Sequence, residues 1–169
     1  FWPMSTADKP KQFIDVLGVG KSLLRLTYER FDGIINNENV WIVTNEKYSE
    51  IVHEQLPEIP IKNILTEPCR RNTAPCIAYV SWRIKKEDSK ANIVVTPSDH
   101  IVTNTVEFKR VISNCLGFTS ETDAIVTLGM KPNRPETGYG YIQADLTIPS
   151  ARNNEIFRVD QFREKPDLE

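Results

Sequence analysis

Residues 39–67, NVWIVTNEKYSEIVHEQLPEIPIKNILTE, contain the pattern that is most informative about the fold. An apolar run of strand length covers 39–45, a segment of helical period follows at 46–56, and a second apolar run covers 61–67. Neither run alternates cleanly between apolar and polar residues, which is typical of strands covered on both faces of a parallel sheet. The stretch therefore predicts a β-α-β unit with a right-handed crossover.

The same alternation continues along the chain on both sides of this stretch. Apolar runs of strand length recur at 92–96 (NIVVT) and 124–130 (AIVTLGM), and residues 106–119 have a helical period. Two further helices are indicated after Lys21 and after Asn72. The first of these has an apolar face made of Leu23, Leu24, Thr27, Phe31 and Ile34. Strands that alternate with helices indicate a layered α/β domain with a mostly parallel sheet.

The last part of the chain has a different pattern. Residues 139–145 (YGYIQAD) and 156–164 (IFRVDQFRE) predict strands, and only a loop rich in Pro, Ser and Asn separates them. Two strands without an intervening helix indicate an antiparallel addition at the sheet edge, which makes the sheet mixed. Because the sequence starts abruptly at Phe1 and stops at a proline turn, we expect the domain to be truncated at both ends.

Length and composition restrict the class of protein. The 169 residues amount to about one domain; they are 40% hydrophobic and 26% charged, with a formal net charge of −2. This charge does not favour binding to nucleic acid or to an anionic membrane, and no apolar run approaches the roughly 18 residues of a membrane span. Three cysteines without CxxC spacing argue against structural zinc and a disulfide framework. We expect a cytoplasmic protein with reduced thiols and with neither nucleic acid nor membrane as a partner.

Residues 96–100, TPSDH, follow one of the apolar runs. Ligands of open α/β sheets bind beyond the carboxyl ends of strands, so Asp99 would lie where a carboxylate can ligate Mg²⁺. An aspartate after a strand is also a common turn former or helix cap, and taken alone the motif favours that structural role. We assign His100 no role in proton transfer.

The stretch PCRRNTAP at 68–75 joins a predicted strand to a predicted helix. Asn72 or Thr73 is a natural helix N-cap, and Pro75 suits the first turn. The functional interpretation is that the loop amides and these two polar side chains hydrogen-bond to the edge of a nucleobase. The residue types alone do not separate the two interpretations, and capping is the simpler one.

Two stretches near the C-terminal end allow a similar choice. In PETGYGY (135–141), glycines on both sides of Tyr139 indicate either a sugar ring against the main chain or a β-bulge. In REKP (163–166), Glu164 and Lys165 form either a surface charge pair or two ligands of one substrate. The second interpretation requires the strand to bend, because neighbouring strand residues point to opposite faces.

The order and spacing of these stretches resemble those of the mannose-1-phosphate guanylyltransferase family. The matching segments are FWPMST (1–6), KPKQF (9–13), EPCRRNTAP (67–75), TPSDH (96–100), PETGYGYI (135–142) and FREKP (162–166). The resemblance implies a Rossmann-like (GT-A-like) three-layer nucleotidyltransferase fold. It also implies that 1–169 is a partial catalytic domain, because the family has a glycine-rich loop before the segment matching Phe1 and a second metal-binding aspartate beyond the segment matching Pro166.

The resemblance further implies transfer of GMP from GTP to mannose 1-phosphate, with Mg²⁺ as cofactor. It makes Asp99 the metal ligand, Lys11 the lysine at the nucleotide phosphates, and Lys165 the lysine that holds the sugar phosphate. The implied nucleotide-binding residues are Lys11, Glu67, Asn72, Thr73 and Ser98. The implied sugar-binding residues are Gly138, Tyr139 and Glu164.

Two alternatives stay open beside this function. The first is a related sugar-1-phosphate nucleotidyltransferase with a different base or sugar, and the second is a regulatory domain that binds sugar nucleotides without turnover. Since the glycine-rich loop supplies phosphate-facing amides in the family, we expect residues 1–169 alone to show weak or no catalysis. A homo-oligomer is among the expectations that the sequence leaves open.

Overall fold

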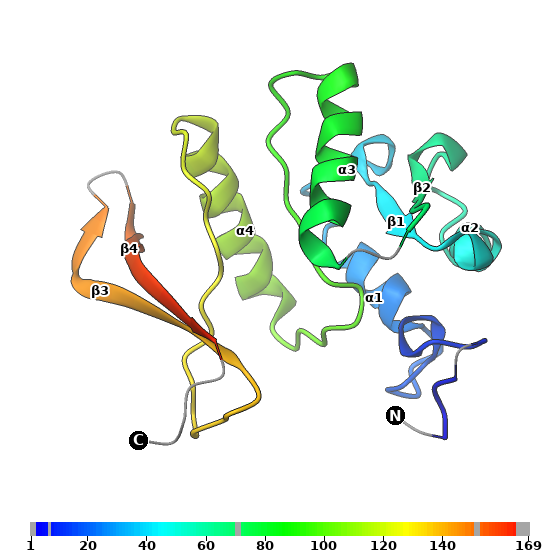
Figure 1. The fold of residues 1–169 in the computed structure, drawn as a ribbon, viewed down its shortest axis with the longest axis horizontal. Coiled ribbons are helices and arrows are strands. Elements are labelled where there is room, and N and C mark those ends of the chain that lie inside the picture. The colour runs from blue at the N-terminus through cyan, green and yellow to red at the C-terminus, as the bar shows by residue number, and fades with distance from the viewer. Residues whose placement is uncertain (1–2, 7, 70–71, 151–152, 165–169) are drawn as a thin grey trace. The chain divides into compact units, whose positions relative to one another are not determined.

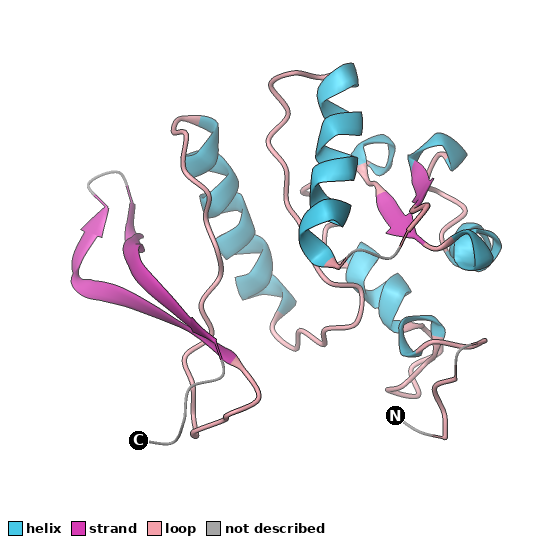
Figure 2. Cartoon of the chain, in the orientation of Figure 1, coloured by secondary structure: helices cyan, strands magenta, loops and turns pink. Residues whose placement is uncertain are grey.

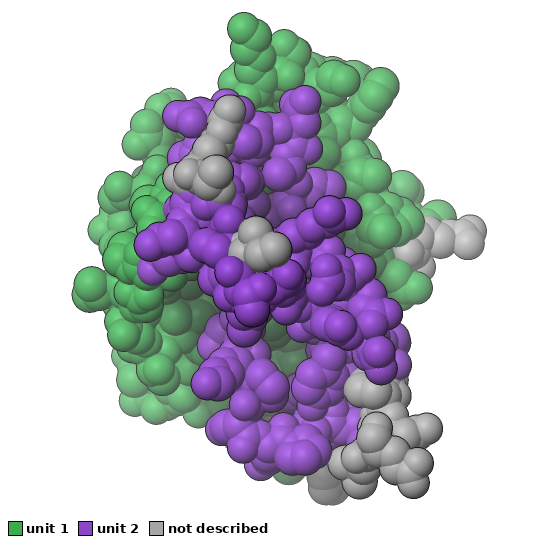
Figure 3. Space-filling view, turned by 90° about the vertical axis from the view of Figure 1, so that its left-hand side faces the viewer, with its two compact units in different colours: residues 1–114 green, residues 115–169 purple. Residues whose placement is uncertain are grey.

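The computed structural model describes residues 3–6, 8–69, 72–150 and 153–164. These divide into two compact units, Phe1–Asn114 and Cys115–Glu169, which Figure 3 distinguishes by colour. The order of helices and strands can be followed in Figures 1 and 2. The prediction of one domain over 1–169 stays a prediction, and each unit is described by itself below.

The predicted β-α-β unit is present in the first compact unit. Strand β1 covers Ile42–Thr44, helix α2 covers Ser49–Gln55 and strand β2 covers Ile64–Thr66. The two strands pair in parallel, from Ile42 opposite Ile64 to Thr44 opposite Thr66. Single 3-10 turns, η3 (Glu46–Tyr48) and η4 (Ile61–Asn63), lead into α2 and β2. The predicted order of strand, helix and parallel strand is confirmed.

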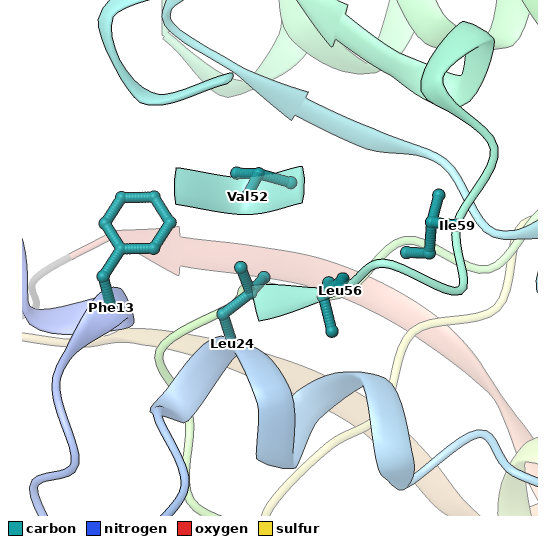
Figure 4. Packing of buried hydrophobic residues seen from close by; sticks show 5 residues of the cluster. All are labelled: Phe13, Leu24, Val52, Leu56 and Ile59. Atoms are coloured by element: carbon teal, nitrogen blue, oxygen red, sulfur yellow. The ribbon is translucent and has the colours of Figure 1, made fainter. Parts of the chain in front are cut away.

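A hydrophobic core holds this unit together. Its buried members are Phe13, Leu24, Val52, Leu56 and Ile59, which Figure 4 shows from close by. They come from the 3-10 turn η1 (Lys11–Phe13), from helix α1 (Leu23–Glu29), from α2 and from the segment that follows α2. Each buried side chain of this size contributes about 2 kcal/mol through removal of apolar surface from water. The core therefore fixes η1 against α2, which matters for Lys11.

The predicted helices are also present, although the first is shorter than predicted: α1 ends at Glu29, before Phe31 and Ile34 of its predicted apolar face. Helix α1 begins after Ser22, whose Oγ accepts a hydrogen bond from the Arg25 amide (3.2 Å), as an N-cap serine does. Helix α3 covers Thr73–Glu87, and helix α4 covers Thr105–Ser120 and crosses the boundary between the compact units. Two lysines in the last turn of α3 suit the negative end of its dipole.

Two predicted strands are not found: residues 92–96 and 124–130 are not part of any strand. Their Val/Ile/Leu composition predicted burial between layers, but a strand also needs a neighbour that supplies hydrogen-bond partners. In the part of the chain that the structure describes, neither segment has such a neighbour, and Val95 and Ile125 are 52% and 99% exposed. The prediction was wrong because an apolar composition does not by itself supply a pairing partner, and these two side chains are not buried either.

The second unit contains the predicted antiparallel pair. Strand β3 (Gly140–Ser150) and strand β4 (Asn153–Glu164) form a two-stranded sheet of their own. Among the described residues they do not extend the edge of the parallel sheet, so the predicted mixed sheet is not found, although the antiparallel pairing is. Their register is regular from Gly140 opposite Glu164 to Gln143 opposite Gln161, and it shifts only beyond Gln143. The β-bulge considered for the glycine pair at 138–140 is therefore not at that position.

Candidate functional site

Lys11 is held in place by the core described above. Lys11 and Phe13 belong to the single turn η1, which Pro10 precedes with a φ of −61°. The buried Phe13 ring packs on Tyr48, with ring centroids 5.6 Å apart. The backbone carbonyl oxygen of Phe13 accepts a hydrogen bond from Gln55 Nε2 (3.1 Å). Because Phe13 points into the core, the rest of this short turn, including the half-exposed Lys11, stays at the surface.

Lys11 lies directly against the predicted metal ligand. Its Nζ is 2.6 Å from Oδ2 of Asp99, and the two side chains are 41% and 27% exposed. His100 Nε2 lies 3.9 Å from the other oxygen of Asp99. Ion pairs with this much exposure contribute little to stability, so the contact matters mainly because it gathers opposite charges from two distant stretches of sequence. Ser98, in the same turn as Asp99, is half-buried.

A buried arginine supports the turn that carries Asp99. Arg30 is 5% exposed, and its Nη2 donates to the carbonyl oxygen of His100 (2.7 Å) and to Thr27 Oγ1. Its guanidinium lies 5.7 Å from the centroid of the Phe108 ring, and burial lowers the pKa of Arg30. An arginine that stays charged in this position is a strong donor to a carbonyl. Arg30 therefore helps to fix the backbone beside Asp99.

Sequence reasoning missed Arg30, although a signal was present. Thr27 and Ile34 belong to the predicted apolar face of the first helix, and Arg30 lies three positions after one and four before the other. A charged residue on such a face indicates a buried, hydrogen-bonded role.

An open pocket of about 590 Å³ lies at the carboxyl ends of the two parallel strands. It is lined by Asn45, Glu46, Lys47, Thr66, Glu67 and Pro68. The Glu67 amide donates to the Thr44 carbonyl (2.9 Å), which extends the ladder by one residue and places Glu67 at the end of β2. This edge is where open α/β sheets bind ligands, so the predicted nucleotide-binding residue Glu67 lies in a suitable pocket.

Cys76, in the first turn of α3, interacts with Glu67. Burial, and after it the neighbouring Glu67 carboxylate, raise the pKa of the Cys76 thiol, which favours its protonated form. All three cysteines are free thiols, as predicted.

Asn72 has an unusual backbone conformation at the start of α3. Its φ is 68° and its ψ is −171°, and it makes no side-chain cap hydrogen bond although it occupies the N-cap position. Both Asn72 and Thr73 are exposed. Capping therefore does not account for the Asn72 side chain, and a backbone outlier of this kind is a reason to consider function. Arg70 and Arg71 lie outside the described residues.

The predicted sugar-binding residues belong to the second compact unit. The Tyr141 hydroxyl accepts from the Glu136 amide (2.8 Å) and donates to the Glu136 carbonyl (3.1 Å). The Gly138 amide donates to Glu136 Oε1 (3.3 Å), so Tyr141 ties down the loop that carries Gly138 and the exposed Tyr139. Tyr141 was not among the predicted residues; a tyrosine directly after the glycine pair was its only signal.

Glu164, the last described residue of β4, pairs with Gly140, and Lys165 lies outside the described residues. The structure thus brings Lys11, Ser98 and Asp99 together in the first unit, with Glu67 in the strand-end pocket. It brings Gly138, Tyr139 and Glu164 together around one end of the β3–β4 pair. Their roles in binding and catalysis stay predictions.

A protein-family model described as "Nucleotidyl transferase" matches residues 1–169. The chain belongs to the nucleotidyl transferase family. Among the described residues of this nucleotidyl transferase, no helix is long and apolar enough to cross a membrane.

Curated relatives are found among bacterial members of the family. A mannose-1-phosphate guanylyltransferase of Escherichia coli is 36% identical over an alignment of 171 positions, which covers 99% of this chain and 36% of that protein. The mannose-1-phosphate guanylyltransferase ManC of Salmonella typhimurium is 34% identical over 99% of this chain and 35% of its own length. The chain therefore spans about a third of the length of the curated relatives that it matches.

A solved structure supports the predicted fold. The crystal structure of a protein named mannose-1-phosphate geranyltransferase, from Thermus thermophilus, superposes with a TM-score of 0.82 at 30% identity. The match covers 99% of this chain and 47% of that one. The Rossmann-like α/β nucleotidyltransferase fold is confirmed by this likeness together with the parallel β1–β2 pair.

Proposed function

We propose that the full-length protein transfers GMP from GTP to mannose 1-phosphate and releases GDP-mannose and pyrophosphate. Membership of the nucleotidyl transferase family supports the reaction type, and the curated relatives' names support these two substrates. The name of the solved neighbour, mannose-1-phosphate geranyltransferase, also contains mannose 1-phosphate, but it names a geranyl group where the curated relatives' names have a guanylyl group. The observation that carries the proposal is the contact between Lys11 and Asp99 (2.6 Å), which sets an ammonium beside a carboxylate in a family that handles phosphates.

In the proposed reaction a phosphate oxygen of mannose 1-phosphate attacks the α-phosphorus of GTP in line. One phosphorus–oxygen bond forms, the bond from the α-phosphorus to the bridging oxygen breaks, and pyrophosphate leaves with that electron pair. No covalent enzyme intermediate is needed, since the attacking phosphate is already an anion. The residues of the chain position two polyanions that repel one another and offset the charge between them. Lys11 supplies positive charge to the nucleotide phosphates in this scheme.

The residues at Asp99 fit a magnesium ion that the substrate helps to hold. No group of three His, Cys, Asp or Glu side chains that could hold a metal is found among the described residues. Mg²⁺ is commonly bound by one or two carboxylates together with waters and substrate phosphates, so the single carboxylate of Asp99, 27% exposed, is sufficient as a protein ligand. A magnesium ion bound there would stabilise negative charge on the phosphates.

The base and the sugar are assigned to separate groups of residues. The residues that would bind the nucleotide beside Lys11 are Glu67, Asn72, Thr73 and Ser98. A carboxylate such as that of Glu67 accepts from guanine N1–H and N2–H₂ and would be repelled by the acceptor at adenine N1. At the sugar, the Glu164 carboxylate accepts hydrogen bonds from hydroxyl groups beside Gly138 and Tyr139, and Lys165 holds the phosphate.

A substrate panel tests the proposal on the full-length protein with Mg²⁺ present. Pyrophosphate release is measured for GTP, ATP, UTP and dTTP, each combined with mannose 1-phosphate or glucose 1-phosphate. The proposal predicts the highest kcat/KM for GTP with mannose 1-phosphate, and GDP-mannose as the product. A preference for UTP or dTTP would assign the protein to a related specificity. Calorimetric binding of GDP-mannose without any turnover would instead support a regulatory binding domain.

A further inference from the structure

The two glycines of the GYG sequence differ in what their surroundings demand. A Cβ added to Gly140 would lie 2.9 Å from Oε2 of Glu164, a separation that real Cβ atoms essentially never show. A Cβ added to Gly138 would lie at an ordinary 3.4 Å from Glu136 Oε1. The glycines with positive φ in the described chain are Gly18, Gly20 and Gly33. The backbone conformation at Gly140 therefore does not require glycine. Glycine is required there because the Glu164 carboxylate lies where a Cβ would be.

This approach comes from regular strand pairing. Gly140 and Glu164 are opposite one another at the first rung of the β3–β4 ladder, and the register continues without a shift to Gln143 and Gln161. Residues opposite one another in an antiparallel pair have their Cβ positions about 5 Å apart on the same face. A long side chain at 164 can then fold over the position where residue 140 would have its own side chain, and Glu164 does so.

We propose that Gly140 is a positioning residue that sets the place of the Glu164 carboxylate and, through it, the affinity for the sugar phosphate. The inference rests on the proposed function, in which Glu164 accepts hydrogen bonds from the hydroxyl groups of the sugar. A methyl group at 140 forces Oε2 to move by about half an ångström before its contact becomes an ordinary one. Displacement of a binding group by a fraction of an ångström weakens its hydrogen bond to the substrate enough to lower the affinity for that substrate about tenfold.

The displaced atom is the far end of a flexible side chain at the surface, so the protein accommodates Gly140→Ala with little loss of stability. This separates the inference from a general structural role of the glycine. The expected result is a rise of about tenfold in KM for mannose 1-phosphate, with kcat within about twofold and the thermal unfolding midpoint unchanged. KM for GTP should also stay the same.

The experiment is a double-mutant cycle in the full-length protein, followed by steady-state kinetics and by calorimetric titration with mannose 1-phosphate. Gly140→Ala is measured alone and in the Glu164→Ala background, where no carboxylate remains to be displaced. The inference predicts that Gly140→Ala weakens binding in the first case and has no further effect in the second. Gly117→Ala is the matched control, because a Cβ there meets nothing within 4 Å.

The outcomes separate the inference from the proposed function. Equal losses from Gly140→Ala in both backgrounds would overturn the inference, because the glycine would then act independently of Glu164. No loss from Gly140→Ala, beside a clear loss from Glu164→Ala, would overturn it as well and would leave the proposed function standing. Wild-type protein that neither binds mannose 1-phosphate nor forms GDP-mannose would refute the proposed function and this inference with it.

Discussion

Replacement of Asn72 by glycine should make the protein more stable and at the same time weaken its binding of nucleotide. Asn72 is the one non-glycine residue with positive φ among those described, and its ψ of −171° lies in a region that almost only glycine adopts. Asparagine tolerates positive φ mainly with ψ near that of a left-handed helix. The strain is not offset by capping, because the side chain makes no cap hydrogen bond to α3.

The magnitude follows from two opposing terms. Such a conformation costs about 2 kcal/mol in a residue with a Cβ, and glycine removes this cost. Glycine also increases the conformational entropy of the unfolded chain, which destabilises the folded state by about 1 kcal/mol. Asn72→Gly should therefore stabilise the protein by about 1 kcal/mol, which raises the unfolding midpoint by about 3 °C for a domain of this size. Asn72→Ala keeps the Cβ and should give no such rise.

The assay combines thermal unfolding with kinetics on the full-length protein. If the exposed Asn72 side chain hydrogen-bonds to the base, both variants should raise KM for GTP by about tenfold, whereas KM for mannose 1-phosphate stays unchanged. Only the glycine variant should also unfold at a higher temperature. A glycine variant that unfolds at or below the wild-type temperature would refute the argument from strain. An unchanged KM for GTP in both variants would refute the contact with the base.

Two further predictions concern a loop brace and a response to acid. Tyr141→Phe removes both hydrogen bonds to Glu136 and should cost about 1 kcal/mol of local stability. Amide hydrogen exchange at Glu136 and Gly138 should become faster. Unchanged exchange would contradict the role of these two hydrogen bonds in holding the loop. Asp15 accepts hydrogen bonds from the amides of Val19 (3.1 Å) and Gly20 (2.6 Å). Desolvation of the Asp15 carboxyl raises its pKa, but the hydrogen bonds from backbone amides lower the pKa by more. The pKa of Asp15 therefore lies below its ordinary value. A lowered folded-state pKa stabilises the protein above the ordinary value of 3.8 and ceases to do so as the pH falls through the folded-state pKa. The unfolding midpoint of the wild type should therefore fall more steeply below about pH 4 than that of Asp15→Asn, and parallel pH profiles would contradict this.

The sequence was a reliable guide where local pattern and pairing partner lie in the same short stretch. Residues 39–67 contain both parallel strands and their crossover helix, so the pattern sufficed to predict β1, α2 and β2. The runs at 92–96 and 124–130 have a similar composition, but neither is paired with a strand in the part of the chain that the structure describes, and composition cannot supply a hydrogen bond. Pairing is a property of two segments, and a pattern describes one.

The same distinction applies to the candidate site. The contact of Lys11 with Asp99 joins two stretches far apart in sequence, and resemblance to a family suggested it where composition could not. The buried role of Arg30 and the two hydrogen bonds of Tyr141 depend on side-chain packing, which residue types indicate only weakly. The difference between Gly138 and Gly140 depends on which side chain lies opposite each one, and only the register of β3 and β4 supplies that.

The most direct test of the proposed chemistry is the rate of pyrophosphate release by full-length Asp99→Ala with saturating GTP, mannose 1-phosphate and Mg²⁺. Loss of the carboxylate beside Lys11 should slow turnover on the order of a thousandfold, because charge stabilisation worth several kcal/mol is removed from the barrier. The exposed Asp123, replaced in the same way, is the control and should turn over at the wild-type rate. A normal rate for Asp99→Ala would contradict the assignment of this pair to the reacting phosphates.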